Sequence, residues 1–201
     1  MDIKSWVIEL RREFHRHPEP SWQEHRTAAR VEEILKSLGV ETRRVAGTGV
    51  VGVLRGGLPG KTVALRADMD ALQQSEKTGL EYASQNPGVM HACGHDAHTA
   101  MLLGAARILA EGKQSLRGNV VFLFQPAEEL AQGAKAMIEA GALEGVDAVF
   151  GIHVWSGLPT GTVSIEPGPR MASVDIFKVT VRGKGGHGSA PHQGIDTIVP
   201  A

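Results

Sequence analysis

Near the start of the chain, apolar residues recur at the spacing of a helix face. This spacing predicts an amphipathic helix over residues 2–16, which ends before Pro18 because the position before a proline disfavours helical backbone. Ser21 followed by Glu24 matches a capping box, so we expect a second helix that begins there and ends at Gly39. The apolar positions of the two helices are Ile3, Trp6, Val7, Leu10, Phe14, Val31, Ile34, Leu35 and Leu38.

The middle of the chain alternates between short apolar runs and helical patterns. Residues 119–124 are apolar at almost every position, as expected of a strand that is buried on both faces of a sheet. A long loop is expected over residues 68–92. The alternation predicts an α/β fold in which a sheet is flanked by helices. The predicted strands are residues 50–55, 62–66, 119–124 and 147–152, and the predicted helices between them are residues 99–109 and 130–141.

The pattern changes near residue 170. Residues 173–182 alternate between apolar and polar side chains, which predicts one long strand. A glycine-rich turn over residues 183–188 and the beginning of a helix near residues 194–199 follow it. Because a strand, a turn and an incipient helix cannot bury a core of their own, we interpret residues 1–170 as one domain and residues 171–201 as the beginning of a second. The apolar members of the predicted strand are Val174, Ile176, Val179 and Val181.

The composition narrows the class of protein. The formal net charge is −1, so we expect neither nucleic acid nor an anionic membrane surface as a partner. The first residues lack the apolar core of a signal peptide, and no apolar run approaches the ~20 residues of a membrane span. The chain has a single cysteine, which excludes an internal disulfide and favours a reducing compartment. We therefore expect a cytoplasmic protein.

The segment that carries the most distinctive chemistry is His-Ala-Cys-Gly-His-Asp-Ala-His, residues 91–98. Cys93 and His95 are two positions apart, with Gly94 between them, in a loop that leads into a predicted helix. Thiolate and imidazole groups placed in this way can bind one divalent transition metal ion. The alternative is that Cys93 is a small buried hydrophobic residue, which is the commoner role of a lone cysteine.

Three further polar segments follow predicted strands, at residues 66–70, 125–129 and 151–155. Open α/β sheets place their ligand sites at the carboxyl ends of strands, so we expect these segments to meet in one crevice. Together with Cys93 and His95 they supply a thiolate, two imidazoles and up to four carboxylates. This set of donors predicts a site for two divalent metal ions with a spare carboxylate.

Each of these segments also has a simpler interpretation when it is taken alone. Asp68 and Asp70 fit loop residues or helix caps. Glu128 and Glu129 fit acids at a helix N-terminus, where the helix dipole favours negative charge. His153 fits a hydrogen-bonded core histidine. In the metal-site interpretation, one of the two adjacent glutamates ligates metal while the other accepts a proton from water.

These motifs resemble those of bacterial and plant amidohydrolases of the aminoacylase, hippurate hydrolase and indole-acetyl-amino-acid hydrolase type, in metallopeptidase family 20. Glutamate carboxypeptidases and succinyl-diaminopimelate desuccinylase belong to the same family. The resemblance extends in order along essentially the whole chain. The matching motifs are His-Arg-His-Pro-Glu-Pro (15–20), RADMDAL (66–72), HACGHDAHTAMLLGAA (91–106), FQPAEE (124–129), GIHVW (151–155) and GKGGHGSAPH (183–192).

The resemblance implies a role for individual residues. It implies that Glu128 is the general base, and that His187 reaches the substrate in the site of a partner subunit. Asp68 and Asp70 lie where relatives keep a ligand histidine and a supporting aspartate, and we expect them to support the ligands. The implied cofactor is a pair of divalent metal ions, Mn or Zn, with Ni or Co as alternatives. The implied metal ligands are Cys93, His95, Glu129 and His153.

The resemblance also implies a fold, an activity and an assembly. The fold is a di-metal aminopeptidase-like catalytic domain followed by a small α+β domain through which a homodimer forms. The activity is hydrolysis of the amide bond of a small-molecule N-acyl amino acid. Family members are longer and supply a last ligand histidine from their second half, so we expect this 201-residue chain to be inactive by itself.

Two alternatives remain open at the level of the sequence. The first is a dipeptidase or carboxypeptidase of the same family, against which the segment Cys93-Gly94-His95 favours the amidohydrolase branch. The second is a non-catalytic, truncated metal-binding remnant. Metal content and hydrolysis of an acetylated or benzoylated amino acid distinguish them.

Overall fold

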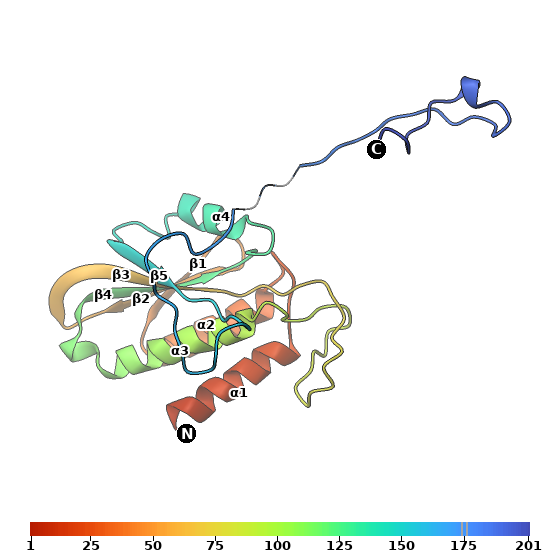
Figure 1. Cartoon of the computed structure of the whole chain (residues 1–201). Helices are drawn as coiled ribbons and strands as arrows, with labels where there is room; N and C mark the ends of the chain where they lie inside the picture. Colours follow the sequence, from red (N-terminus) through yellow and green to blue (C-terminus); the bar gives the residue numbers. More distant parts are fainter. Residues whose placement is uncertain (174, 176) are drawn as a thin grey trace. The chain divides into compact units, whose positions relative to one another are not determined.

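The structure is a computed structural model that describes residues 1–173, 175 and 177–201 (Figure 1). The chain divides into two compact units, Met1–Gly157 and Leu158–Ala201, which are described separately. The first unit contains every α-helix and every strand of the described residues.

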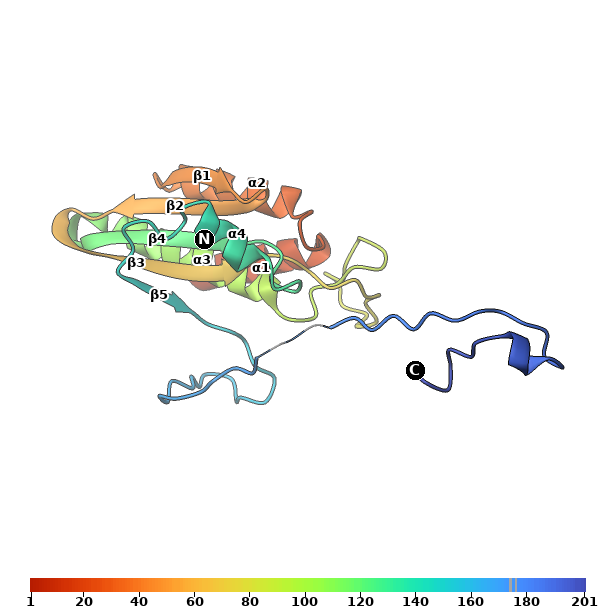
Figure 2. The same cartoon turned by 90° about the horizontal axis from the view of Figure 1, so that it is seen from above.

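The first unit is built on a five-stranded mixed sheet with the order β1-β2-β4-β3-β5 (Figure 2). β2 pairs antiparallel with β1 and β4, whereas β3 pairs parallel with β4 and β5. The register sets Asp68 opposite Gln125 and Arg66 opposite Gly151, so the carboxyl ends of β3, β4 and β5 meet at one edge. The strands are β1 (Glu41–Val45), β2 (Gly49–Arg55), β3 (Leu58–Asp68), β4 (Arg117–Gln125) and β5 (Ala148–Gly151).

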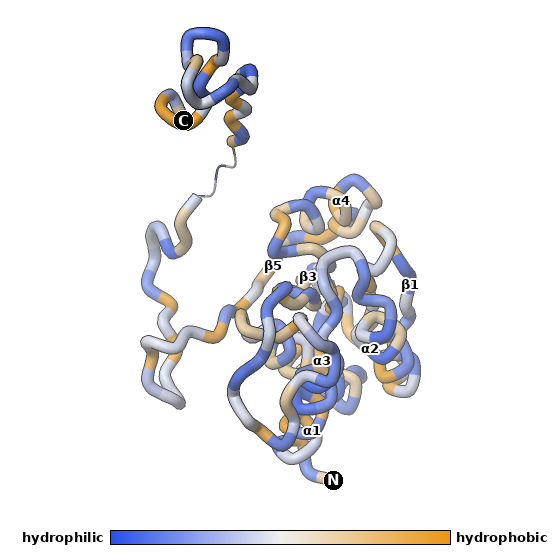
Figure 3. The backbone as a smooth tube through the Cα atoms, turned by 90° about the vertical axis from the view of Figure 1, so that its right-hand side faces the viewer, coloured by the Kyte–Doolittle hydropathy of each residue, from blue (hydrophilic) through white to orange (hydrophobic). Residues whose placement is uncertain are grey.

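Helices cover both faces of this sheet, as Figures 1 and 3 show. On one face lie α1 (Ile3–Arg16), α2 (His25–Ser37) and α3 (His95–Glu111), and on the other lies α4 (Gly133–Glu139). The prediction of an α/β fold with a flanked sheet is confirmed. Within the part of the chain that the structure describes, no helix is long and apolar enough to cross a membrane.

The almost wholly apolar strand β4 has a core on each side. Phe122 and Phe124, each 0% exposed, point into the cluster formed with α1, α2 and α3. Val121 and Leu123 point the other way and pack in a cluster with Met137 of α4. Successive side chains of a strand point to opposite faces, so a strand between two helical layers must be apolar throughout. The prediction for residues 119–124 is therefore confirmed.

The sequence interpretation missed β1. Its residues are Glu-Thr-Arg-Arg-Val, of which only Val45 is buried. β1 is an edge strand that pairs with β2 along one side. Backbone hydrogen bonds hold such a strand without an apolar stripe, so hydrophobic periodicity could not reveal it.

The predicted capping box at the start of α2 was wrong. Glu24 makes no side-chain capping hydrogen bond. Glu19 takes that place, because its carboxylate accepts hydrogen bonds from the backbone N–H groups of Arg26 (2.9 Å) and Thr27 (2.8 Å). The hydroxyl of Ser21 instead donates to Asp70 Oδ2 at 2.7 Å. Spacing identifies candidates for a cap, but tertiary partners decide which acid reaches the helix end.

A buried ionic cluster joins α1 to α3. His15 is 2% exposed, and its Nδ1 lies 2.8 Å from Asp96 Oδ2 while its Nε2 lies 3.2 Å from Glu76 Oε1. Arg11 Nε donates to the same oxygen of Asp96 at 2.8 Å. The hydrogen bond to Asp96 raises the pKa of His15 above its ordinary value, although burial opposes the shift.

This cluster makes stability depend on pH. Because the pKa of His15 is higher in the folded state, protonation of His15 stabilises the fold fully below about pH 6.5, and this contribution is lost as the pH rises through the folded-state pKa. We expect the melting temperature of the chain to fall as the pH rises above about 6.5, and to fall less in a His15→Gln variant. Thermal melts followed by circular dichroism measure the difference. Replacing the exposed His25 by Gln is the control, and equal pH profiles for both variants would contradict the prediction.

The second unit contains little regular structure. A short 3₁₀ helix spans Pro191–Gln193, and Lys184 forms an antiparallel bridge with Ile195. Of the predicted strand 173–182, Val174 and Ile176 lie outside the described residues, and residues 177–182 are not in a strand. Residues 194–199 are not helical, so these two predictions were wrong for the described residues.

Residues 177–182 form no strand because an extended segment needs a neighbouring strand to bind its backbone N–H and C=O groups. Residues 177–182 pair with no neighbour among the described residues of this unit. The functional domain boundary near residue 170 stays a prediction.

Candidate metal centre

The loop before α3 brings Cys93 and His95 to the carboxyl edge of the sheet. Gly94, which precedes the first helical residue, has a φ of 94°, in the left-handed region that favours glycine. A Cβ atom at Gly94 would lie 2.4 Å from Cγ2 of Val154, so this position also lets the chain after β5 approach closely. A glycine is therefore favoured at position 94 for two reasons, the left-handed backbone conformation and the close contact with Val154.

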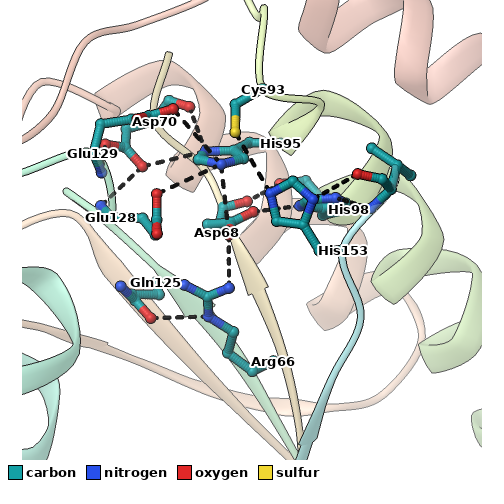
Figure 4. A network of polar contacts seen from close by, with 12 residues as sticks. Arg66, Asp68, Asp70, Cys93, His95, His98, Gln125, Glu128, Glu129 and His153 are labelled. Carbon is teal, nitrogen blue, oxygen red and sulfur yellow. Dashed lines mark hydrogen bonds and ion pairs between the residues drawn. The ribbon is translucent and has the colours of Figure 1, made fainter. Parts of the chain in front are cut away.

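The other candidates come from the ends of neighbouring parallel strands. Asp68 ends β3, Glu128 and Glu129 follow β4, and His153 follows β5. Figure 4 shows these side chains around His95. The predicted convergence of strand ends at one edge is what the register produces.

The candidate ligand atoms lie at separations suited to shared metal ions. Cys93 Sγ is 3.5 Å from His153 Nε2, and His95 Nε2 is 3.8 Å from Glu129 Oε1 and 3.7 Å from Glu128 Oε2. Donor atoms that share one tetrahedral metal at bonds of about 2.0–2.3 Å lie roughly 3.3–3.8 Å apart. Within the described residues, one trio comprises Cys93, His95 and His153, and another comprises His95, Glu128 and Glu129.

Two buried atoms of this site have no hydrogen-bond partner among the residues that the structure describes. His95 is 0% exposed, and its Nδ1 donates to the backbone oxygen of Asp70 at 2.9 Å, which leaves the lone pair of Nε2 free. Glu129 Oε1 is also buried and unpartnered. Buried polar atoms are nearly always satisfied, and a metal ion would satisfy both atoms at once. The residues therefore fit a metal-binding role.

The electrostatics of the donor set also favour a cation. Burial, together with the carboxylates of Glu129 and Glu128, raises the pKa of the Cys93 thiol to about 12. Burial raises the pKa of Glu129 as well, against the effect of His95. These shifts arise because negative charge gathers where little solvent reaches, and a divalent cation reverses them.

Two buried carboxylates hold the turn that presents Glu128 and Glu129. Asp70, 0% exposed, accepts hydrogen bonds from the backbone N–H groups of Glu128 and Glu129, each at 3.0 Å. Glu24, also 0% exposed, accepts from the N–H of Ala127 at 2.9 Å. Ala127 has a φ of 48°, which is unfavourable for a residue with a side chain. The expected supporting role of Asp70 agrees with this geometry, whereas Glu24 was not identified from the sequence.

His98 is the second residue that the sequence interpretation left out of the site. α3 begins at His95, one turn earlier than the apolar run 99–109, so His98 lies one turn along the same helix, and its ring is 5.5 Å from that of His95. The three-residue spacing of the two histidines was the signal in the sequence that could have identified His98.

His98 forms a short hydrogen bond with a buried carboxylate. Its Nδ1 lies 2.6 Å from Asp68 Oδ1. This hydrogen bond and the charge of Arg66 hold the pKa of Asp68 well below its usual range, although burial alone would raise it.

His187 belongs to the second unit. Its side chain is exposed, and its Nδ1 lies 2.8 Å from the hydroxyl of Ser189. The substrate-binding role expected from the resemblance stays a prediction.

The fold and the site together define a class of protein. It is an α/β protein with a cluster of potential metal ligands at the carboxyl edge of its parallel strands. Residues 64–195 match Peptidase family M20/M25/M40, and the chain belongs to this family.

Relatives of known name and structure lie within the same family. The chain is 54% identical to thermostable carboxypeptidase 1 of Saccharolobus solfataricus, over 98% of this chain and 51% of that protein. It is 52% identical to the N-acyl-L-amino acid amidohydrolase of Geobacillus stearothermophilus, over 98% and 54%. The YXEP protein of Bacillus subtilis, described as a dinuclear metal binding peptidase, superposes with a TM-score of 0.80 at 43% identity, over 83% and 47%. The chain spans about half the length of the curated relatives it matches.

Proposed function

We propose that the protein is a metal-dependent amidohydrolase that cleaves the amide bond of N-acyl amino acids. The observation that carries the proposal is the pair of buried, unpartnered atoms, His95 Nε2 and Glu129 Oε1, beside the more exposed carboxylate of Glu128. The amidohydrolase of Geobacillus stearothermophilus, at 52% identity, supports the reaction class.

In this proposal, each residue has a distinct task. Cys93, His95, Glu129 and His153 hold two divalent ions, Mn or Zn, with Ni or Co as alternatives. Bound ions of this kind lower the pKa of water and polarise the carbonyl group under attack. Glu128 accepts the proton of the attacking water and returns it to the nitrogen of the leaving amine.

The proposal extends to the assembly. We infer a cytoplasmic homodimer in which the second unit of one subunit supplies His187 to the site of its partner. The exposed position of His187 in the chain supports this inference, because the side chain is free to reach another molecule. The substrate is a small molecule, and the protein has no nucleic-acid or membrane partner.

A chimera tests the proposed function. In it, the Geobacillus stearothermophilus amidohydrolase supplies the part of its own chain that lies outside the match, because this chain covers 54% of that relative. We expect the 201-residue chain to bind Zn²⁺ or Mn²⁺ without hydrolytic activity, and the metal-loaded chimera to release free amino acid from N-acetyl or N-benzoyl amino acids. Elemental analysis and an amine assay measure the two properties. A chain that binds no divalent metal would refute the proposal.

A second candidate is a carboxypeptidase, which is favoured by the name of the relative that is 54% identical. The same chimera distinguishes the two functions when it is given N-blocked dipeptides in parallel. Faster release of the C-terminal residue from a dipeptide than from an N-acetyl amino acid would favour the carboxypeptidase.

The role of His187 can be tested by mixing two inactive variants of the chimera. A dimer of one His187→Ala subunit and one Glu128→Gln subunit has one site with both wild-type residues. We expect about a quarter of the wild-type rate in an equal mixture, because half of the dimers are mixed and one of their two sites is intact. His192→Ala, at an exposed histidine of the same unit, is the active control. Mixed dimers as inactive as either parent would show that His187 does not act across the interface.

A further inference from the structure

Both ring nitrogens of His98 are occupied. The residue is 2% exposed, and its Nδ1 lies 2.6 Å from Asp68 Oδ1 while the N–H of Val154 points at its Nε2 from 2.9 Å. A backbone N–H can only donate, so Nε2 must be the acceptor and Nδ1 must carry the proton that Asp68 accepts. His98 is therefore in a defined tautomer with no lone pair left for a metal ion.

Both carboxylate oxygens of Asp68 also accept hydrogen bonds. Its Oδ1 accepts from His98, and its Oδ2 accepts from Arg66 Nη1 at 2.6 Å (Figure 4). Asp68, His95 and His98 are close enough to form a third trio of potential ligands. Using His98 as a ligand would break one of its two buried hydrogen bonds, whereas His95 Nε2 has none to lose among the described residues.

His153 needs such support because it follows the last strand. β5 ends at Gly151, so residues 152–155 lie beyond the ladder of the sheet. The N–H of Val154 connects this segment to α3 through His98. His153 Nδ1 lies 2.6 Å from the backbone oxygen of Val154, which directs Nε2 toward Cys93 Sγ.

The rings of the two histidines are also in contact. Their centroids are 4.6 Å apart with an interplanar angle of 69°, an edge-to-face arrangement. His98 thus holds the segment by a hydrogen bond and also forms a wall against the ring of His153.

We propose that His98 is a positioning residue, which fixes His153 opposite Cys93 through the N–H of Val154 and is itself fixed by Asp68. The inference rests on the metal centre of the proposed function. It assigns His98 no bond to metal and no contact with substrate, and it makes the pairing of Cys93 with His153 depend on a residue that touches neither the ion nor the reacting atoms.

Two substitutions of His98 test this role, because each keeps one of the two hydrogen-bonding positions of the imidazole ring and removes the other. The amide of Asn matches the position of Nδ1, so His98→Asn keeps a donor for Asp68 and loses the acceptor for Val154. The amide of Gln reaches the position of Nε2, so His98→Gln keeps the acceptor for Val154. The probe is Co²⁺ added to the 201-residue chain, because its thiolate charge-transfer absorption reports a bond to Cys93, the single cysteine.

We expect His98→Asn to bind Co²⁺ about 10–100-fold more weakly than wild type with altered ligand-field bands, and His98→Gln to stay within about threefold. His91→Gln is the matched control, since His91 is 4% exposed in the same segment and makes no side-chain hydrogen bond in the described structure. An Asn variant that binds like wild type would overturn the proposal. So would an Asn variant that binds better than the Gln variant, because His98 would then act through Asp68 alone.

A measurement on the wild-type chain covers the case in which the variants do not fold. With ¹¹³Cd²⁺ bound and the histidines labelled with ¹⁵N, we expect cadmium–nitrogen coupling to His95 and His153, and an Nδ1–H tautomer without coupling for His98. Coupling to His98 would overturn the inference. If the wild-type chain shows neither a cobalt–thiolate band nor cadmium coupling to any histidine, the metal centre fails, and with it the proposed function.

Discussion

Replacing Glu128 by Gln is expected to lower kcat of the chimera by about 10²–10⁴-fold and to leave its metal content unchanged. The neighbouring glutamates differ in their surroundings. The side chain of Glu129 is 21% exposed, with one buried and unpartnered oxygen, whereas that of Glu128 is 39% exposed. A ligand to metal is expected at the buried position, and a group that exchanges protons with water is expected at the open one.

The backbone of Glu128 is held independently of its side chain. Its N–H donates to Asp70 Oδ1 at 3.0 Å, and this hydrogen bond survives the change to Gln. Steady-state kinetics and elemental analysis of the purified variant give the two quantities. Glu139→Gln, on the exposed side of α4, is the control that should retain full activity. A normal rate in Glu128→Gln would show that another group is the base, and loss of metal would show that Glu128 is a ligand.

Removing the carboxylate of Glu24 is expected to have the largest effect on stability. Glu24 Oε1 accepts from the backbone N–H groups of Trp22 (3.0 Å) and Ala127 (2.9 Å), and Oε2 accepts from the hydroxyl of Thr48 at 2.5 Å. Trp22 and Ala127 both have positive φ, of 66° and 48°. In Glu24→Ala these donors lose their partner inside the protein, at about 1–3 kcal/mol for each buried group. We expect a loss of roughly 3–5 kcal/mol in the free energy of unfolding.

Glu24→Gln is expected to retain most of the stability. Its amide oxygen can accept from Trp22 and Ala127, and its NH₂ group can donate to Thr48, whose hydroxyl also accepts. Urea unfolding of the 201-residue chain measures the difference. Glu13→Ala is the control, because Glu13 pairs with Arg26 and Arg30 in a solvent-accessible position, where such pairs contribute about 0–1 kcal/mol. Equal losses in Glu24→Ala and Glu13→Ala would show that the buried carboxylate is not what holds the turn.

The two Glu24 variants are also expected to differ in metal binding. Ala127 directly precedes Glu128 and Glu129, so relaxation of its backbone displaces both side chains. We expect the Glu24→Ala variant to bind metal more weakly than the wild-type chain and the Glu24→Gln variant to retain metal binding.

The sequence was sufficient to predict the elements whose signal is local. An apolar run as short as residues 119–124 favours a strand between two layers, because every side chain in it must leave water and buried helices are usually longer. Helical spacing in α1 and α2 has an equally simple cause, since one face of each helix packs into the core on the same side of the sheet, α1 against α3 and α2 against the strands. The grouping of the candidate ligands followed from the same logic, because polar residues after neighbouring parallel strands share an edge of the sheet.

Signals that depend on distant partners were not readable. β1 is held by backbone pairing with β2, and Ser21 donates to Asp70 instead of capping the adjacent helix. The spacing of Ser21 and Glu24 was compatible with a cap, but Glu24 makes buried hydrogen bonds to Thr48 and Ala127, far away in the chain. Such choices depend on which donors the folded chain brings near.

The sequence by itself determined the fold class and most of the donor set, because hydrophobic periodicity and residue chemistry are local properties. Only the tertiary structure decided which of these candidate donor atoms are left without a hydrogen-bond partner among the described residues. His95 and His98 are both buried histidines of one helix, yet Nε2 of the first has no partner and Nε2 of the second accepts the N–H of Val154. Whether a nitrogen is free for metal depends on neighbours from β3 and the segment after β5, and their positions are set by the packing of the whole sheet.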